Sequence, residues 1–209
     1  MTTNICIKEF KEPPFDKKEI LRYAKVKEPT PEIEALLDEC IAQVKGKLSY
    51  KVVYRVYPMD NDRRTVDLGF AKTDSEFLIH GLWCCFHVAV FTATVGLYID
   101  RLVRRYAVVS PAKALLIDAI GAERVEALCD AFCAFLKEEM AKEKRETRSR
   151  MSPGYGDIPL SLQKDIFAVL DCPKSIGVSL GESYLMTPRK SVTALVGITP
   201  MLPDEEKNS

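Results

Sequence analysis

The sequence has no excess of charge of either sign, and it has very little histidine. Thirty Lys and Arg balance thirty Asp and Glu among 209 residues, and there are only two histidines. A nucleic-acid-binding protein is expected to carry a basic excess or a clustered basic face, so this balance argues against one. Hydrophobic residues make up 47% of the chain, which excludes low-complexity disorder. A chain of this length can bury a sizeable core, and we expect one domain over residues 1–209.

Several sequence motifs of common enzymes are also missing. There is no GxSxG, which argues against a nucleophile elbow, and no phosphate-binding P-loop. Gly154-Tyr155-Gly156 is followed by Asp157 and lacks the third glycine of a dinucleotide-binding GxGxxG turn. A Cys–His dyad remains open, although nothing in the sequence supports it.

The cysteines and the N-terminus predict a reducing, cytoplasmic location. The N-terminal residues contain no apolar core of signal-peptide length, and an odd number of cysteines without repeated spacing is a poor disulfide framework. Residues 77–99 form an uncharged run long enough to span a bilayer. Polar and glycine interruptions favour a short helix that leads into a buried strand, so we expect no membrane contact. The seven cysteines are Cys6, Cys40, Cys84, Cys85, Cys129, Cys133 and Cys172.

A group of metal-binding residue types lies within this run. His80 and Cys84 are four residues apart, one turn of a helix, and Cys85 and His87 follow. Structural zinc sites normally join two ligand pairs across a loop, and that spacing is absent. Buried free cysteines behave as small hydrophobic residues. We therefore predict core residues here, as for Cys129 and Cys133, and no metal site.

The remaining pattern predicts an α+β fold, because helices and strands do not alternate regularly. Thr30-Pro31 and Ser110-Pro111 each combine an N-cap residue with proline at the first helical position. Gly121 either separates two helices or kinks one. Residues 1–14 are expected to be irregular or an edge segment. We expect helices over residues 16–24, 30–45, 75–83, 97–106, 110–146 and 160–170. We expect strands over residues 50–57, 65–70, 86–94, 176–185 and 191–198, with a frayed tail at 203–209.

The residues RSRMSPGYGD at 148–157 form the strongest candidate for a ligand site. Gly154 permits a positive φ and a close backbone approach, and Tyr155 offers a flat ring with a polar hydroxyl. The planar guanidinium of Arg150 suits a carboxylate. Together these groups could bind a zwitterion that carries an aromatic base. A simple Gly/Pro turn would explain the same residues.

A family resemblance favours the ligand site. The run Arg150-x-x-Pro153-Gly154-Tyr155 resembles the AdoMet-binding signature of the activation domain of cobalamin-dependent methionine synthase. The resemblance covers roughly residues 90–198, whereas residues 1–48 are an N-terminal helical part that matches only in general character. Its further segments are Thr94-Val95-Gly96, residues 163–170, Ile176-Gly177, Glu182-Ser183-Tyr184-Leu185-Met186-x-Pro188 and Ser191-Val192.

The resemblance implies a twisted antiparallel sheet with flanking helices that binds S-adenosylmethionine (AdoMet). In that family AdoMet donates the methyl group for reductive methylation of cob(II)alamin, and flavodoxin is the usual electron source. By position, Arg150 would hold the methionyl carboxylate, and Gly154 and Tyr155 would contact the rest of the ligand. The candidate cofactor-binding set is Arg150, Pro153, Gly154, Tyr155, Glu146 and Glu182. No catalytic acid or base is implied.

The sequence departs from the family pattern in three ways. Lys144 stands where an acidic residue is expected, with Glu143 and Glu146 near enough to substitute. The tyrosine downstream of Ser191-Val192 has no counterpart. There is no D-x-H-x-x-G loop that would ligate cobalamin, so the corrinoid would belong to a separate methyltransferase chain, of which this protein would be an accessory component. The alternative is an interaction module that docks on a corrinoid protein without binding AdoMet.

Overall fold

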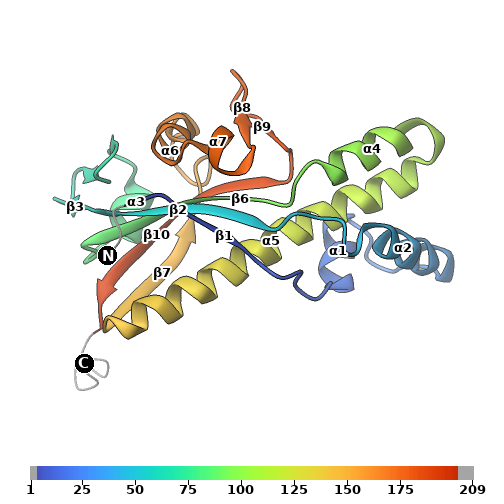
Figure 1. Ribbon diagram of the computed structural model, residues 1–209, viewed down its shortest axis with the longest axis horizontal. Coiled ribbons are helices and arrows are strands. Elements are labelled where there is room, and N and C mark those ends of the chain that lie inside the picture. The colour runs from blue at the N-terminus through green and yellow to red at the C-terminus, as the bar shows by residue number, and fades with distance from the viewer. Residues whose placement is uncertain (1–3, 202–209) are drawn as a thin grey trace.

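A five-stranded antiparallel sheet forms the centre of the protein (Figure 1). The structure, a computed structural model, describes residues 4–201. The sheet order is β1-β2-β6-β10-β7, and two small sheets, β3-β4-β5 and β8-β9, lie outside it. The main strands are β1 (Cys6–Glu9), β2 (Lys51–Pro58), β6 (His87–Thr94), β7 (Arg145–Met151) and β10 (Ser191–Pro200). The short strands are β3 (Asp60–Asn61), β4 (Val66–Asp67), β5 (Lys72–Thr73), β8 (Ser179–Leu180) and β9 (Met186–Thr187).

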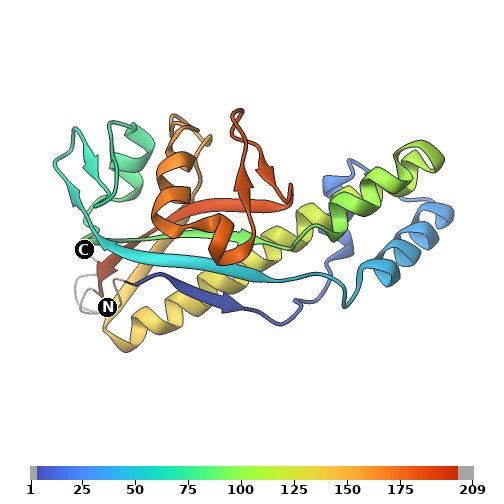
Figure 2. The same ribbon diagram turned by 45° about the horizontal axis from the view of Figure 1, so that its top comes forward.

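Helices cover both faces of the main sheet (Figure 2). The long α5 crosses one face, and α1, α2 and α4 pack around it at one end of the molecule. The opposite face carries α3, α6 and α7. The helices are α1 (Lys17–Tyr23), α2 (Pro31–Val44), α3 (Glu76–Gly81), α4 (Tyr98–Val109), α5 (Pro111–Lys142), α6 (Leu162–Leu170) and α7 (Cys172–Ile176).

The central strand β6 explains the uncharged run in the sequence. Phe91 points into the core beneath α5, whereas Val88 and Val90 belong to the core on the opposite face. Successive side chains of a strand alternate between faces, so a strand covered on both faces is apolar at nearly every position. Residues 77–99 accordingly form most of α3, a turn, β6 and the first two residues of α4. No helix within residues 4–201 combines the length and the hydrophobicity of a membrane span.

The α+β prediction is confirmed, as are the proline-marked helix starts. Pro31 and Pro111 occupy the first turns of α2 and α5, where a missing N–H has no cost. Asp16 accepts the backbone N–H groups of Lys18 and Glu19 and caps α1. The edge segment predicted near the N-terminus contains β1, paired with β2. The tail predicted at 203–209 lies outside the described residues.

Three sequence predictions were wrong in detail. The helix expected to reach Glu146 ends at Lys142, and residues 145–151 form β7. Glu, Lys and Arg favour helices, but here pairing with β10 fixes them in a strand, after Lys144 has turned the chain at φ 54°. Residues 176–185 contain the end of α7 and only two residues of strand, and residues 65–70 contribute only β4. Gly121 lies inside one continuous α5, where Ile99 and Lys190 pack closely against it.

Candidate functional site

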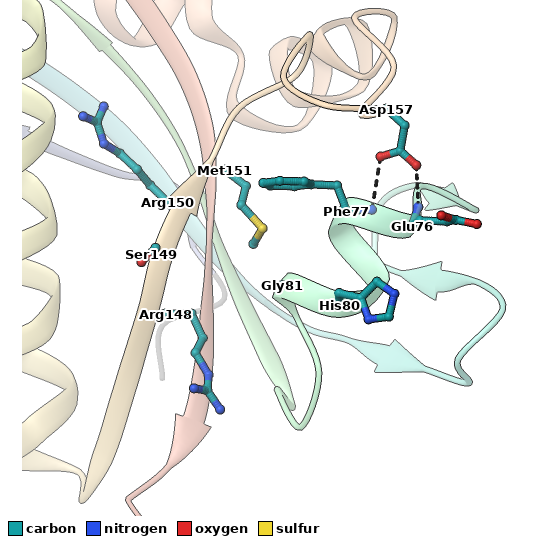
Figure 3. Close-up of a pocket in the computed structure, with 9 residues that line it drawn as sticks. All are labelled: Glu76, Phe77, His80, Gly81, Arg148, Ser149, Arg150, Met151 and Asp157. Carbon is teal, nitrogen blue, oxygen red and sulfur yellow. Dashed lines mark hydrogen bonds between the residues drawn. The ribbon is translucent and has the colours of Figure 1, made fainter.

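A β-bulge in β7 directs neighbouring arginines to opposite faces of the sheet. Val196 of β10 pairs with Arg150 and Ile198 pairs with Thr147, so three steps along β7 oppose two along β10. Residues two apart in a regular strand share one face, but the extra residue breaks this alternation. Arg148 therefore lies on the α3 side of the sheet, while Arg150 points toward α5 (Figure 3).

Arg150 joins the end of β7 to the middle of α5. Its Nη2 atom donates to Glu126 Oε2 at 2.5 Å and to Asp130 Oδ1 at 3.2 Å. Burial by itself would lower the pKa of this guanidinium, but the hydrogen bond to Glu126 and the surrounding negative charge raise it. Neither Nε nor Nη1 of Arg150 donates to any atom of the described residues. Since neither is a buried orphan either, both can still serve a ligand carboxylate.

Arg150 forms one end of a cavity that is rich in carboxylates. This cavity, of about 450 Å³, lies between the segment before α1, α1 itself and α5. We call it the acidic cavity, and among residues 4–201 Arg150 is the one basic residue that lines it. Its lining residues are Pro13, Pro14, Asp16, Glu19, Tyr23, Glu123, Glu126, Ala127, Asp130 and Arg150. Such a lining favours a ligand that carries positive charge beside one carboxylate.

Arg150 also lines a second cavity, on the other side of β7. This cavity, of about 760 Å³, lies between β7 and α3, and we call it the β7–α3 cavity. Met151 points into it from the strand and Phe77 from the helix (Figure 3). The sulfur of Met151 would lie 2.3 Å from a Cβ on Gly81, so a glycine lets α3 approach the strand closely. The lining residues are Glu76, Phe77, His80, Gly81, Arg148, Ser149, Arg150, Met151 and Asp157.

Asp157 fastens the loop after β7 to the start of α3. Its carboxylate accepts hydrogen bonds from the Ser75 hydroxyl at 2.5 Å and from the backbone N–H groups of Glu76 at 2.6 Å and Phe77 at 3.1 Å. A carboxylate at a helix N-terminus satisfies orphan donors. The Ser75 hydroxyl, followed by these N–H groups, lowers the pKa of Asp157. The position of the loop therefore depends on hydrogen bonds between Asp157 and residues 75–77, which are far from it in sequence.

Of the loop after β7, Asp157 lines the β7–α3 cavity, whereas the predicted residues Pro153, Gly154 and Tyr155 line neither this cavity nor the acidic cavity. Gly154 has φ 86°, a conformation that favours glycine, and its N–H donates to the Ile158 carbonyl at 2.9 Å. Pro153 is buried beneath the turn. Tyr155 is exposed, and its ring meets Phe77 edge to face with 5.4 Å between centroids. The loop thus places an exposed tyrosine ring against Phe77, which itself lines the β7–α3 cavity.

The structure places the other predicted residues elsewhere. Glu146 lies opposite Thr199 in the β7–β10 pairing, and Glu143 ends α5 with an ion pair to Arg145 at 3.8 Å. Glu182 is exposed in the hairpin between β8 and β9. These three glutamates line neither the acidic cavity nor the β7–α3 cavity.

The cysteine and histidine cluster does not form a helical ligand pair. His80 lies in α3, but the helix ends at Gly81 and Cys84 follows in a turn with φ 60°. The one-turn spacing assumed for His80 and Cys84 was therefore wrong. No group of three or more His, Cys, Asp or Glu side chains in residues 4–201 is arranged to hold a metal ion. Cys129 is buried in the core beneath α5, and burial raises the pKa of its thiol.

Glu126, Asp130 and Phe77 were not among the residues predicted from the sequence. Glu126 and Asp130 are four residues apart and share a face of α5 next to its apolar stripe, which is the one local signal that could have marked them. Their partner Arg150 lies near the end of β7, so the contact depends on how the helix crosses the sheet. No local sequence pattern marked Phe77, because its contact with Tyr155 joins residues that are far apart in sequence.

Comparisons with known proteins show the family and the fold of the chain. The family model for the activation domain of vitamin B12-dependent methionine synthase matches residues 84–201, more than half of the chain. The crystal structure of the MetH reactivation domain bound to AdoHcy has the same fold, with a TM-score of 0.65 and 15% sequence identity over 96% of this chain and 80% of that one. No curated protein matches the sequence. The chain belongs to the family of the activation domain of vitamin B12-dependent methionine synthase.

Proposed function

We propose that this protein binds AdoMet at Arg150 and supplies its methyl group to cob(II)alamin held by a separate corrinoid-binding methyltransferase, such as methionine synthase. The observation that carries the proposal is the position of Arg150 between the acidic cavity and the β7–α3 cavity. Membership in the activation-domain family supports it, as does the AdoHcy bound to the protein of the same fold.

The charges around Arg150 suit the amino-acid end of AdoMet. That end carries a carboxylate, an ammonium group and, three carbons away, a sulfonium. Either Nε or Nη1 of Arg150 can donate to the carboxylate in a charge-assisted hydrogen bond. Glu126 and Asp130 then lie beside the ammonium and sulfonium charges. In this chain the two carboxylates of α5 would thus replace the acidic residue that Lys144 displaces.

The β7–α3 cavity suits the adenosine end. Aromatic side chains bind a flat base by stacking, and Phe77 and Tyr155 present such rings beside the loop. Gly154 keeps the loop backbone free of a side chain at the point where a ligand would pass. Pro153 holds this turn from below.

The sulfonium provides an already activated methyl group, so the protein has to bind and orient rather than supply an acid or base. Cob(II)alamin must also gain one electron, which flavodoxin or another donor would bring. Cobalamin would be supplied by the partner, because the sequence has no cobalamin-ligating loop. All seven cysteines are free, which suits the reducing cytoplasm.

An interaction module that does not bind AdoMet is the second candidate. One observation favours it: Arg150 already contacts two carboxylates of its own chain. A structural ion pair of this kind needs no ligand. The two candidates differ in whether AdoMet binds at all.

Isothermal titration of AdoMet into the wild type and Arg150→Ala separates them. Loss of a charge-assisted pair is expected to cost about 2 kcal/mol, which is about a 30-fold weaker Kd. Arg101→Ala on the exposed face of α4 is the matched control and should bind as the wild type does. No heat and no thermal shift at millimolar AdoMet would rule out the ligand and leave the interaction module.

Three further variants test which carboxylates contact AdoMet. Glu126→Gln should weaken AdoMet binding several-fold, whereas Glu146→Gln should not. AdoHcy lacks the sulfonium charge, so Asp130→Asn should reduce the preference for AdoMet over AdoHcy. An effect of Glu146→Gln alone would place the acidic group on β7 and contradict the assignment to α5.

A further inference from the structure

The exposed aromatic side chains of this protein are gathered on one side. Within the part of the chain that the structure describes, every exposed aromatic residue belongs to α3, to the turn after it or to the loop at 152–157. Trp83 is the one tryptophan of the sequence. The exposed fractions are 40% for Phe77, 39% for Trp83, 60% for Phe86 and 65% for Tyr155. Exposed apolar groups that gather in this way mark binding surfaces.

Arginines without ion pairs accompany these rings. The Arg63 guanidinium lies over the Trp83 ring at 4.3 Å from its centroid. Arg63, Arg64 and Trp83 line a cavity of about 670 Å³ on the outer side of α3, which we call the outer cavity. Neither arginine forms an ion pair with any carboxylate in residues 4–201. Aromatic and arginine side chains are the types most enriched at the energetic centres of protein interfaces.

The outer cavity adjoins the proposed AdoMet site. Glu76 and His80 of α3 line both the outer cavity and the β7–α3 cavity, so the helix is the wall between them. Phe77 and Tyr155 continue the aromatic surface to the mouth of the β7–α3 cavity. A chain that contacts Trp83 and Arg63 would therefore stand beside any ligand held there.

We propose that Phe77, Trp83, Tyr155, Arg63 and Arg64, the aromatic rim, dock the corrinoid-carrying protein through an acidic face of that partner. This proposal rests on the proposed function. A methyl group moves only to a cobalt atom brought within contact distance, so the partner has to land at the mouth of the cavity that holds AdoMet. The unpaired arginines complement carboxylates on the partner.

Most of the aromatic rim lies outside the part of the sequence that the family model matches. Four of its five residues precede residue 84, where the match to the family model begins, whereas Arg150 and the loop at 152–157 lie within the match. Apart from Phe77, the proposed ligand-binding groups therefore lie in the family segment. The preceding segment of this chain supplies most of the surface that meets the partner.

The aromatic rim is tested by measuring binding to the methionine synthase chain of the same organism. That chain is prepared without an activation domain and with its bound cobalamin in the cob(II)alamin state. We expect Trp83→Ala to weaken the complex at least tenfold in biolayer interferometry with saturating AdoMet. Arg63→Glu/Arg64→Glu should weaken it as much, and the wild-type Kd should rise steeply with salt. The matched control is Arg101→Glu/Arg104→Glu on α4, which reverses two exposed charges outside the rim and should leave the Kd unchanged.

Titration of AdoMet into the same variants keeps the two proposals apart. Trp83→Ala and Arg63→Glu/Arg64→Glu should bind AdoMet with the wild-type affinity while losing the partner. Equal partner affinity in wild type, Trp83→Ala and Arg63→Glu/Arg64→Glu would overturn the rim proposal, as would a wild type that binds AdoMet but forms no complex. If the wild type did not bind AdoMet but still formed a complex that the rim substitutions weaken, only the assignment of AdoMet as ligand would be overturned.

Discussion

Arg124 and Arg150 both contact carboxylates of α5, and they differ in how many of their hydrogen-bond donors the protein satisfies. Arg124 is fully buried, and all three of its nitrogens are engaged: Glu123 accepts from Nε and Nη2, and the carbonyls of Pro13 and Pro14 accept from Nη1 and Nη2. Its guanidinium also lies over Phe15. Arg150 uses a single nitrogen, and its side chain is 25% exposed.

The comparison separates a structural cation from one that can bind a ligand. Burying a charge is costly unless it is paired and hydrogen-bonded, and Arg124 meets that condition through Glu123 and the carbonyls of Pro13 and Pro14. These bonds fasten the segment before α1 to α5. Arg150 keeps two donors toward solvent and lies at the edge strand of the sheet. The same residue type is thus used twice, and only the incompletely satisfied copy can exchange its partners for a ligand.

The largest expected effect comes from removing the buried cation. Arg124→Met leaves the Glu123 carboxylate buried without its partner, and it leaves two proline carbonyls without donors. We expect a loss of about 3–5 kcal/mol in the free energy of unfolding, measured by urea denaturation. Glu123→Gln/Arg124→Met should recover part of it, because no buried charge remains. A loss below about 1 kcal/mol would contradict the structural role.

The same substitution at the partly exposed site should cost far less stability. Arg150→Met frees Glu126 and Asp130 to be rehydrated, and partly exposed ion pairs contribute about 0–1 kcal/mol. The same urea titration measures it. If Arg150→Met were as destabilising as Arg124→Met, the two arginines would be equivalent and the contrast between them would be lost.

The smallest effect concerns the carboxylate that orders the loop. Asp157→Asn should lower the melting temperature at neutral pH, because the Ser75 hydroxyl and two N–H groups bind the charged form. The pKa of Asp157 is lowered in the folded state, so its contribution is complete above the ordinary value of about 3.9 and is lost as the pH falls through the folded-state pKa. Thermal melts between pH 3 and 7 should show the difference between wild type and variant shrinking below about pH 4. A difference that grows with acidity would contradict this assignment.

Local signals in the sequence were sufficient for most helices and for the ligand-site loop. Asp16, Pro31 and Pro111 mark helix starts through hydrogen bonding and backbone geometry within a few residues. Gly154 marks its turn in the same way, since a positive φ is a property of one residue. Such features do not depend on the rest of the fold.

Features that depend on distant partners were not predictable in this way. The residues of β7 have the composition of a helix and become a strand because the edge of β10 is there to pair with them. The bulge that sends Arg148 and Arg150 to opposite faces leaves no pattern in the sequence. Glu126 and Asp130 gain a role only because α5 crosses the sheet at Arg150.

Periodicity, caps and motif spacing act over short distances, so the fold class, the family and the residues of the RxxPGY loop could be predicted without coordinates. The three-dimensional arrangement was needed to find which carboxylates surround Arg150, which arginine is buried, and which aromatic rings lie beside the cavity. These depend on contacts between residues separated by 20 to 111 positions. Charges and hydrogen bonds act through space, and the folded path of the chain sets the distances between the groups that interact.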